Sequence, residues 1–271
     1  MGNFLAKHLG RQILYTSIAL LAFALATLIV PMFFSMGPYE SHRHDVFHAP
    51  SAKFFFGTDE LGRDIFIRVM YGSRISLSTV AVSLILALPF GTALGISAGF
   101  FGGFWDALLM RVMDIWLSFP AFVMAIALAI LMGPGTITAM LAIGIVSVPQ
   151  FARVCRAKTL SVKEEAFVEA ARAMGASNLY ILLKTILPNI QSIIFVQAAL
   201  TAGYAVLMEA ALSFLGLGTN PPNPSWGIML KKASIYLSDA PWYGILPGVF
   251  LTLLILLLNK LSDDMNAYYK I

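Results

Sequence analysis

The stretch RVCRAKTLSVKEEAFVEAARAMGASNLYILLKTILP, residues 153–188, is the one long polar interruption in the second half of an otherwise apolar chain. Within it, four apolar residues recur at the three- and four-residue spacing of one helical face: Phe167, Ala170, Ala171 and Met174. Three charged residues fall on the other face: Glu165, Glu169 and Arg172. The pattern predicts a short amphipathic helix.

The residues that follow predict where this helix ends. Gly175 can adopt the left-handed conformation found at many helix ends, and Ser177 can cap a second short helix that runs to a break at Pro188. A solvated charged face is the simpler interpretation of such a segment. The small residues and the single methionine of the apolar face favour docking against another surface.

The composition places the chain in a membrane. Hydrophobic residues make up 59% of its 271 residues and charged residues 12%, which is too apolar for an ordinary soluble domain. The net charge of +4 comes from Lys and Arg in the connections between apolar runs, so an excess of positive residues on the inner side explains it better than nucleic-acid binding does. The single cysteine, Cys155, excludes an internal disulfide and is interpreted as a structural thiol.

We expect an all-α fold with about six transmembrane helices. The predicted crossings are residues 13–34, 75–99, 115–132, 136–152, 189–208 and 243–258. The first run is too long for a cleaved signal peptide and lacks a small-residue cleavage site after it. Six crossings from an inner start place both termini and residues 153–188 on the cytoplasmic side, where the six Lys and Arg of that stretch belong.

Two regions follow from these crossings. Residues 1–74 are an anchor helix, an extracytoplasmic loop and an interfacial helix, and residues 75–271 are a five-helix core that contains the 153–188 loop. For the interfacial helix, Thr58 is the predicted cap and Asp59 and Glu60 the first turn. Its predicted apolar stripe is Leu61, Ile65, Val69 and Met70.

Several charged residues in this region are expected to form pairs. The outer arginines Arg63, Arg68 and Arg74 oppose the positive-inside pattern, and pairing with Asp59, Glu60 and Asp64 would soften the conflict. Further along the chain, Arg111 and Asp114 are three residues apart and are expected to pair on one helical face.

Small residues predict one close helix contact. Gly91, Gly95 and Gly99 recur at four-residue steps, which lets a second helix approach closely. Packing against a partner chain is the favoured interpretation, and packing within this chain is the alternative.

Glu209 lies about 30 Å beyond Asn189 along its helix, near the outer membrane boundary. A carboxylate there is either functional or a hydrogen-bonded structural group, and the sequence leaves both open. With Ser213 and Phe214 it forms a possible pore or outer-gate group.

The sequence lacks the common catalytic and nucleotide-binding patterns. It contains no Walker A motif, no Gly-x-Ser-x-Gly elbow and no His-Glu-x-x-His. His42, His44 and His48 cluster in the exported loop, but no carboxylate spacing completes a metal site, so none is expected. A membrane-embedded enzyme is accordingly disfavoured.

Three motifs carry a resemblance to a known family. Glu169-Ala170-Ala171, Gly175 and the run 185–188 resemble the EAA loop of permease subunits in bacterial ATP-binding-cassette importers, with Thr185 as a departure. Residues 57–77, GTDELGRDIFIRVMYGSRISL, and residues 213–227 resemble the dipeptide, oligopeptide and nickel branch. The resemblance implies a type I importer permease fold, with these residues coupling the chain to an ATPase: Glu165, Glu169, Ala170, Ala171, Arg172, Gly175 and Pro188.

The same resemblance implies partners and a location. It implies a second permease subunit, two ATPase subunits that hold ATP and Mg, and an extracytoplasmic binding protein, with no cofactor on this chain and a place in the bacterial cytoplasmic membrane. Short peptides are the expected substrate, and nickel, metal chelates or glutathione are the alternatives. A stand-alone secondary transporter is a rival class, although it would usually show inverted repeats and ionisable groups at the membrane midplane.

Overall fold

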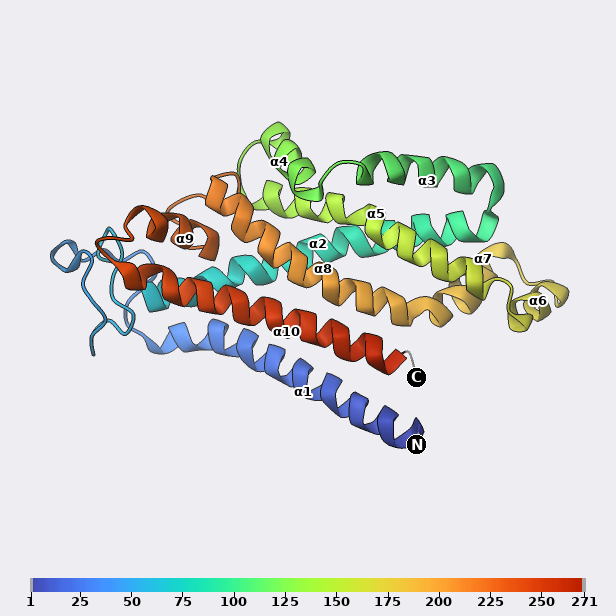
Figure 1. Cartoon of the computed structure of the whole chain (residues 1–271), viewed down its shortest axis with the longest axis horizontal. Coiled ribbons are helices and arrows are strands. Elements are labelled where there is room, and N and C mark those ends of the chain that lie inside the picture. Colours follow the sequence, from blue (N-terminus) through green and yellow to red (C-terminus); the bar gives the residue numbers. More distant parts are fainter. Residues whose placement is uncertain (1, 270–271) are drawn as a thin grey trace.

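The chain folds into an elongated bundle of helices (Figure 1). The computed structural model describes residues 2–269, with side chains from His8 onward, so the outermost bounds of the two predicted regions, Met1 and Ile271, lie outside the described residues. Between residues 2 and 269 there is no β-strand, and Thr58 and Asp64 form an isolated bridge. The predicted all-α class is confirmed.

Long helices run along the bundle axis. They are α1 (Gly2–Ile29), α2 (Ile65–Phe101), α3 (Gly103–Leu117), α5 (Thr136–Val162), α8 (Leu187–Leu215) and α10 (Ile245–Tyr269). The shorter helices are α4 (Ala121–Met132), α6 (Ala166–Ala173), α7 (Asn178–Tyr180) and α9 (Trp226–Ile235). Short 3-10 turns cover Val30–Phe33, Arg43–Asp45 and Pro241–Gly244, and a π-helical segment covers Ile181–Ile186.

Among the described residues, five helices are long and apolar enough to cross a membrane, and the bent pair α3–α4 brings the number to six. The predicted third crossing was wrong in shape: it begins at Gly103, and α3 and α4 meet at 87°. Pro120 explains the break, because the residue before a proline is pushed out of the helical conformation. By contrast, Pro149 does not interrupt α5, which continues to Val162.

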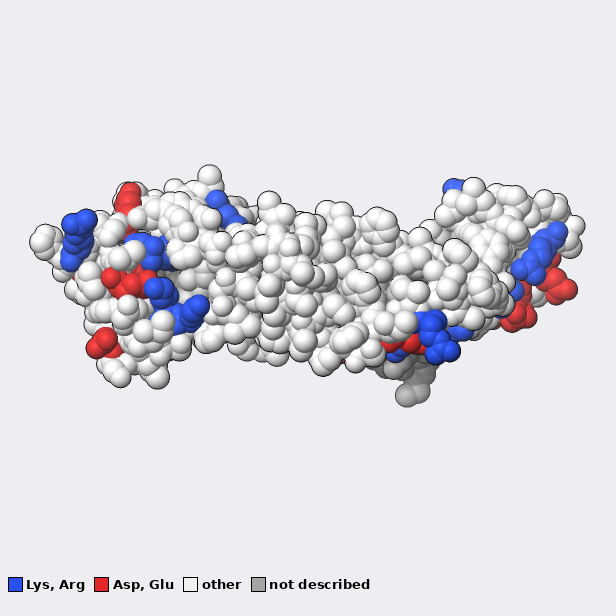
Figure 2. All heavy atoms as spheres, turned by 90° about the horizontal axis from the view of Figure 1, so that it is seen from above, with Lys and Arg blue, Asp and Glu red and all other residues white. Residues whose placement is uncertain are grey.

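The bundle has two polar ends and an apolar middle. On the face shown in Figure 2, Lys, Arg, Asp and Glu gather at the two ends and leave the middle uncharged. One end carries α6 together with the first described residue of α1 and the last of α10, and we call it the α6 end (Figure 1). The other carries the 34–64 loop and α9, and we call it the loop end.

The most extensive helix contact joins α2 to α5. A Cβ placed on Gly91 would lie 2.3 Å from Phe151 Cβ, and one on Gly95 would lie 2.3 Å from the carbonyl oxygen of Ala152. The small-residue face is therefore filled within this chain, and the prediction that it packs against a partner chain was wrong. A second helix of the same chain was the competing interpretation, and spacing alone could not separate the two.

We predict that Gly95→Val destabilises the protein by about 1–3 kcal/mol or more, because two backbones meet where the new side chain must go. Gly248→Val is the matched control, since the nearest atom to a Cβ there is Leu230 Cδ2 at 3.9 Å. Unfolding of both purified variants by SDS titration in mixed micelles checks this. Equal midpoints for the two variants would contradict the assigned contact.

Candidate functional site

The segment between α5 and α8 forms a compact projection at the α6 end, and its turns follow from specific residues. α6 ends at Ala173 with Met174 as its cap, and the next residue, Gly175, has a φ of +81° that suits glycine. Ala176 N donates to Ala171 O (3.0 Å) and Gly175 N donates to Arg172 O (2.9 Å), the two bonds of a Schellman motif. The Ser177 hydroxyl then accepts from Tyr180 N and caps α7. Both predicted turn signals are confirmed.

One face of α6 is anchored to the bundle. Val168 and Ala171 are buried in an apolar cluster that also contains Phe100, Val162 and Ile181. Val168 was not predicted to belong to this face, because the predicted apolar stripe runs through Phe167 and Met174. These two side chains are 43% and 81% exposed. The predicted apolar face is therefore split, with Ala171 inside the chain.

The opposite face of α6 is open to a partner. Phe167, Ala170 and Met174 are exposed apolar residues beside the exposed charges of Glu165, Glu169 and Arg172. The Arg172 guanidinium also lies 5.5 Å from the centre of the Phe100 ring, a cation–π contact that ties the charged face to α2. A mixed apolar and charged surface on an anchored helix can dock another protein.

The chain leaves α6 without the predicted break. Pro188 lies in the first turn of α8, and the π-helical segment Ile181–Ile186 joins α7 to α8. A proline in a regular helix lacks an N–H donor and clashes with the carbonyl four residues earlier, and a wider turn relieves both problems. The prediction of a break at Pro188 was wrong for this reason.

Ion pairs join α3 to α5 near the α6 end. Arg156 Nη2 donates to Asp106 Oδ2 (2.6 Å), and Arg153 Nη2 donates to Asp114 Oδ1 (2.8 Å). The expected pairing of Asp114 with Arg111 was wrong, because Arg153 of the neighbouring helix reaches Asp114 instead. These ion pairs join α3 to α5, the helix that leads into the α6 segment.

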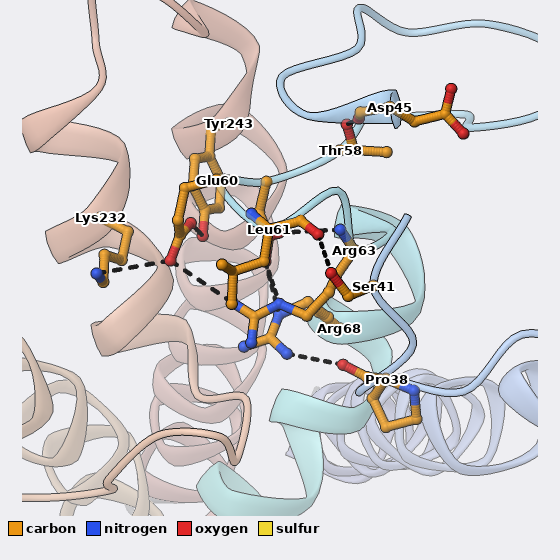
Figure 3. A network of polar contacts seen from close by, with 11 residues as sticks. Pro38, Ser41, Asp45, Thr58, Glu60, Leu61, Arg63, Arg68, Lys232 and Tyr243 are labelled. Carbon is orange, nitrogen blue, oxygen red and sulfur yellow. Dashed lines mark hydrogen bonds and ion pairs between the residues drawn. The ribbon is translucent and has the colours of Figure 1, made fainter. Parts of the chain in front are cut away.

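The loop end holds a buried charge network (Figure 3). Asp59, which is fully buried, accepts from Arg63 Nε at 2.7 Å and lies 3.3 Å from Arg68 Nε. Arg68 also donates to the carbonyl oxygen of Pro38 at 2.7 Å. The 34–64 loop is thereby tied to the start of α2.

A second carboxylate extends the network to α9 and α10. Glu60 Oε2 accepts from the Tyr243 hydroxyl at 3.0 Å, and Glu60 Oε1 lies 3.5 Å from both Lys232 Nζ and Arg63 Nη2 (Figure 3). A cavity of about 400 Å³ opens beside these groups. The predicted pairing of Arg63 and Arg68 with outer carboxylates is confirmed, whereas Arg74 stacks on the Tyr71 ring at 4.3 Å.

The predicted start and cap of the interfacial helix were wrong. The helix begins at Ile65, and Asp64 is its cap, accepting from Ile67 N at 3.1 Å. Thr58 instead accepts from His48 N at 2.8 Å within the loop, and Asp59 is held by the arginines. Burial raises the pKa of the Asp64 carboxyl, and the hydrogen bond from Ile67 N opposes that rise.

The possible outer-gate residues lie in different environments. Glu209 is 1% exposed and its Oε1 accepts from the Ser213 hydroxyl at 2.7 Å. The Ser213 hydroxyl in turn accepts from Thr219 N at 2.9 Å. Glu209 and Ser213 are therefore inaccessible in this structure, while Glu209 Oε2 has no hydrogen-bond partner among the described residues. Phe214 is partly exposed and lines an apolar groove.

The three loop histidines do not converge. The rings of His42 and His48 lie 6.0 and 5.8 Å from the ring of Phe54, which they pack against. Among the described residues, no group of three or more His, Cys, Asp or Glu side chains could hold a metal ion.

The geometry is that of a multi-span helical bundle with one anchored helix, α6, whose outer face is exposed, as in a membrane transport subunit. The chain belongs to the family of binding-protein-dependent transport system inner membrane components, which it matches over residues 91–269. It is therefore a multi-pass inner-membrane permease subunit of an ATP-binding-cassette importer.

Named relatives cover most of the chain. It is 42% identical over 249 residues to the dipeptide transport system permease protein DppC of Alkalihalophilus pseudofirmus, with 92% of this chain and 82% of that protein covered. It is 38% identical to the glutathione transport system permease protein GsiD of Escherichia coli O157:H7, with 90% and 82% covered.

Solved structures confirm the type I importer permease fold. An inward-facing structure of the MetNI methionine ABC transporter matches with a TM-score of 0.57 at 17% identity, and the match covers 75% of this chain and 96% of that chain. A second crystal form matches with a TM-score of 0.55.

We predict that Asp59→Ala lowers the free energy of unfolding by about 3–5 kcal/mol, because it leaves two buried arginines without their shared carboxylate. Lys53→Ala is the control: it removes the exposed ion pair with Asp45, which should cost at most about 1 kcal/mol. SDS-titration unfolding measures both. A loss in Asp59→Ala no larger than in Lys53→Ala would show that the network does not hold the loop.

Proposed function

We propose that this chain is one of two permease subunits of a peptide importer and that α6 is its contact with a cytoplasmic ATPase. The observation that supports this most is that α6 is fixed to the bundle through Val168 and Ala171 while Phe167, Ala170 and Met174 remain exposed. A helix that must transmit motion needs a rigid inner face and a free outer face.

The proposed orientation places the α6 end in the cytoplasm. Residues 153–188 contain six Lys and Arg, and the ends of α1 and α10 lie on the same side (Figure 1). The 34–64 loop and α9 then face the extracytoplasmic side, where a binding protein delivers the substrate.

The coupling residues divide into two roles. Glu169 and Glu165 supply charge to the ATPase surface, Arg172 stays on its cation–π contact, and Ala170 permits close approach. Ala171 anchors α6 from within, Gly175 sets the turn and Pro188 starts α8. Closure of the ATPase on nucleotide would shift α6, and α5 and α8 would follow because both are joined to it.

In this proposal the partner subunits bind and hydrolyse the nucleotide and so supply the energy for transport. ATP and Mg bind to two ATPase subunits, and this chain binds no cofactor and performs no chemical step. Co-purification of ATPase subunits with the tagged chain tests this, and their absence would favour a stand-alone secondary transporter or a membrane-embedded enzyme.

Short peptides are the proposed substrate. The relative DppC is a dipeptide permease, and the relative GsiD is a permease for glutathione, which is itself a short peptide derivative. Nickel and metal chelates remain the alternative within the family. Because the binding protein does most of the choosing, a binding assay on the partner receptor with dipeptides, glutathione and nickel chelates decides among them. Exclusive binding of nickel would overturn the peptide assignment.

We predict that Glu169→Lys or Gly175→Val abolishes substrate-stimulated ATP hydrolysis by the reconstituted complex while membrane insertion is unchanged. The first reverses a charge on the exposed face, and the second places a branched side chain at a φ of +81°. Glu164→Lys is the control, because Glu164 is also exposed but precedes α6. Full stimulation in both test variants would refute the assignment of α6 as the ATPase contact.

A further inference from the structure

A polar groove lies on the face of α8 between α5 and α10. It encloses about 450 Å³, and five of its lining residues carry polar side chains: Gln150, Gln197, Thr201, Tyr204 and Asn259. They come from three helices, with Gln150 on α5, the next three on α8 and Asn259 on α10. No Asp, Glu, Lys or Arg lines it.

The groove lies within the membrane-spanning part of the bundle. At 1.5 Å per residue, Gln197 is about 12 Å and Tyr204 about 22 Å from Asn189, where the predicted crossing starts, in a hydrocarbon core about 30 Å thick. By the same measure Gln150 and Asn259 are each about 21 Å from the first residue of their own helix, which places Gln150 near the end of the predicted crossing 136–152 and Asn259 just after the crossing 243–258, within the candidate span Pro241–Tyr269. Polar atoms from three helices therefore meet in the half of the bundle nearer the α6 end, within the candidate spans.

Four of these side chains are partly or fully exposed and free to bind, namely Gln150, Gln197, Tyr204 and Asn259, whereas Thr201 is 2% exposed and supports Gln197 from within. Gln197 Nε2 donates to Thr201 Oγ1 at 3.3 Å, which uses one of its two N–H donors. A Cβ on Gly203 would lie 2.9 Å from Asn259 Oδ1, so the missing side chain makes room for the amide beside α8. The amides of Gln150 and Asn259 add two further donor and acceptor pairs.

Contact with lipid does not suit this surface. Unpaired amides and hydroxyls are costly in hydrocarbon, and polar side chains at membrane depth usually face a water-filled path or a partner group. The groove also continues toward the loop end: Leu207 lines it and also lines the apolar groove of about 300 Å³ that contains Ala211 and Phe214. One face of α8 is thus hollowed from its middle to its outer half.

We propose that this groove is the part of the translocation path contributed by this chain, and that its amides and hydroxyls form passing hydrogen bonds with the uncharged backbone amides of a peptide. The substrate class rests on the proposed function. Side-chain amides offer both a donor and an acceptor, which matches the peptide group and is independent of the peptide's side chains. A path for a metal cation would instead need carboxylate, imidazole or thiolate ligands, and none lines this groove.

Cysteine labelling in the assembled transporter tests whether the groove holds water. In a Cys155→Ser background, which removes the one native cysteine, Gln197→Cys and Asn259→Cys are treated with a membrane-impermeant, positively charged methanethiosulfonate. Leu256→Cys is the matched control, because Leu256 is exposed on α10 outside the groove. The labelling rates are measured with and without ATP. In at least one of these two states we expect the groove cysteines to react about tenfold faster than the Leu256→Cys control, because a charged reagent is excluded from hydrocarbon. Rates no faster than at Leu256→Cys in every state would overturn the proposal.

A second measurement addresses the peptide. With dialanine and the binding protein present, we expect labelling of Asn259→Cys to slow, and we expect Asn259→Leu to reduce dialanine transport about fivefold, the effect of one lost hydrogen bond. Leu256→Ala should leave transport unchanged. Fast labelling that dialanine does not slow, together with normal transport by Asn259→Leu, would overturn the peptide contact.

The test of the proposed substrate is independent of the test of the water-filled groove. If wild-type complex does not transport dialanine but transports another solute, the peptide assignment is lost, while the labelling rates still decide whether the groove is a water-filled path.

Discussion

The close contact between α2 and α5 is the constraint on which the rest of this structure depends. α2 has 37 residues, so it extends about 55 Å and joins the two ends of the bundle. Arg68 near its start belongs to the loop-end network, and Phe100 near its end packs under α6. Because Gly91, Gly95 and Gly99 bring α5 against it with no room for a side chain, the two helices form one rigid unit.

Sequence reasoning found this unit in part. The glycine spacing predicted a close helix contact, but the same spacing suits a partner chain and a neighbouring helix equally, and only the fold shows that α5 fills the face. The cap of α2 was misplaced for a similar reason. Thr58 and Asp64 are both good capping residues, and the choice depends on Asp59 being held by Arg68, a contact that local propensity does not contain.

In the candidate site, too, the features set by local sequence could be predicted, and those set by tertiary packing could not. Gly175 and Ser177 act within one or two turns, so their roles could be read from the sequence. The division of the α6 apolar residues into an inner pair and an outer trio depends on where the bundle lies, and Val168 was missed on that account. The groove residues were missed because Gln150, Gln197 and Asn259 are uncharged, whereas attention to ionisable groups led to Glu209, which is buried and hydrogen-bonded.

These features together assign different mechanical roles to the helices. α5 packs closely against α2 and forms ion pairs with α3. We therefore expect α2, α3 and α5 to move together. α8 leaves the α6 segment through a π-helical turn, a geometry with fewer regular hydrogen bonds than an α-helix and one often found at functional sites. Because α8 carries most of the groove, any motion of α8 relative to the α2–α5 unit, to which α6 is anchored through Phe100 and Val162, would alter the groove. A groove lined by neutral amides suits this motion, because each hydrogen bond can be exchanged at small cost as the helix moves, whereas a buried ion pair in the same place would have to be broken.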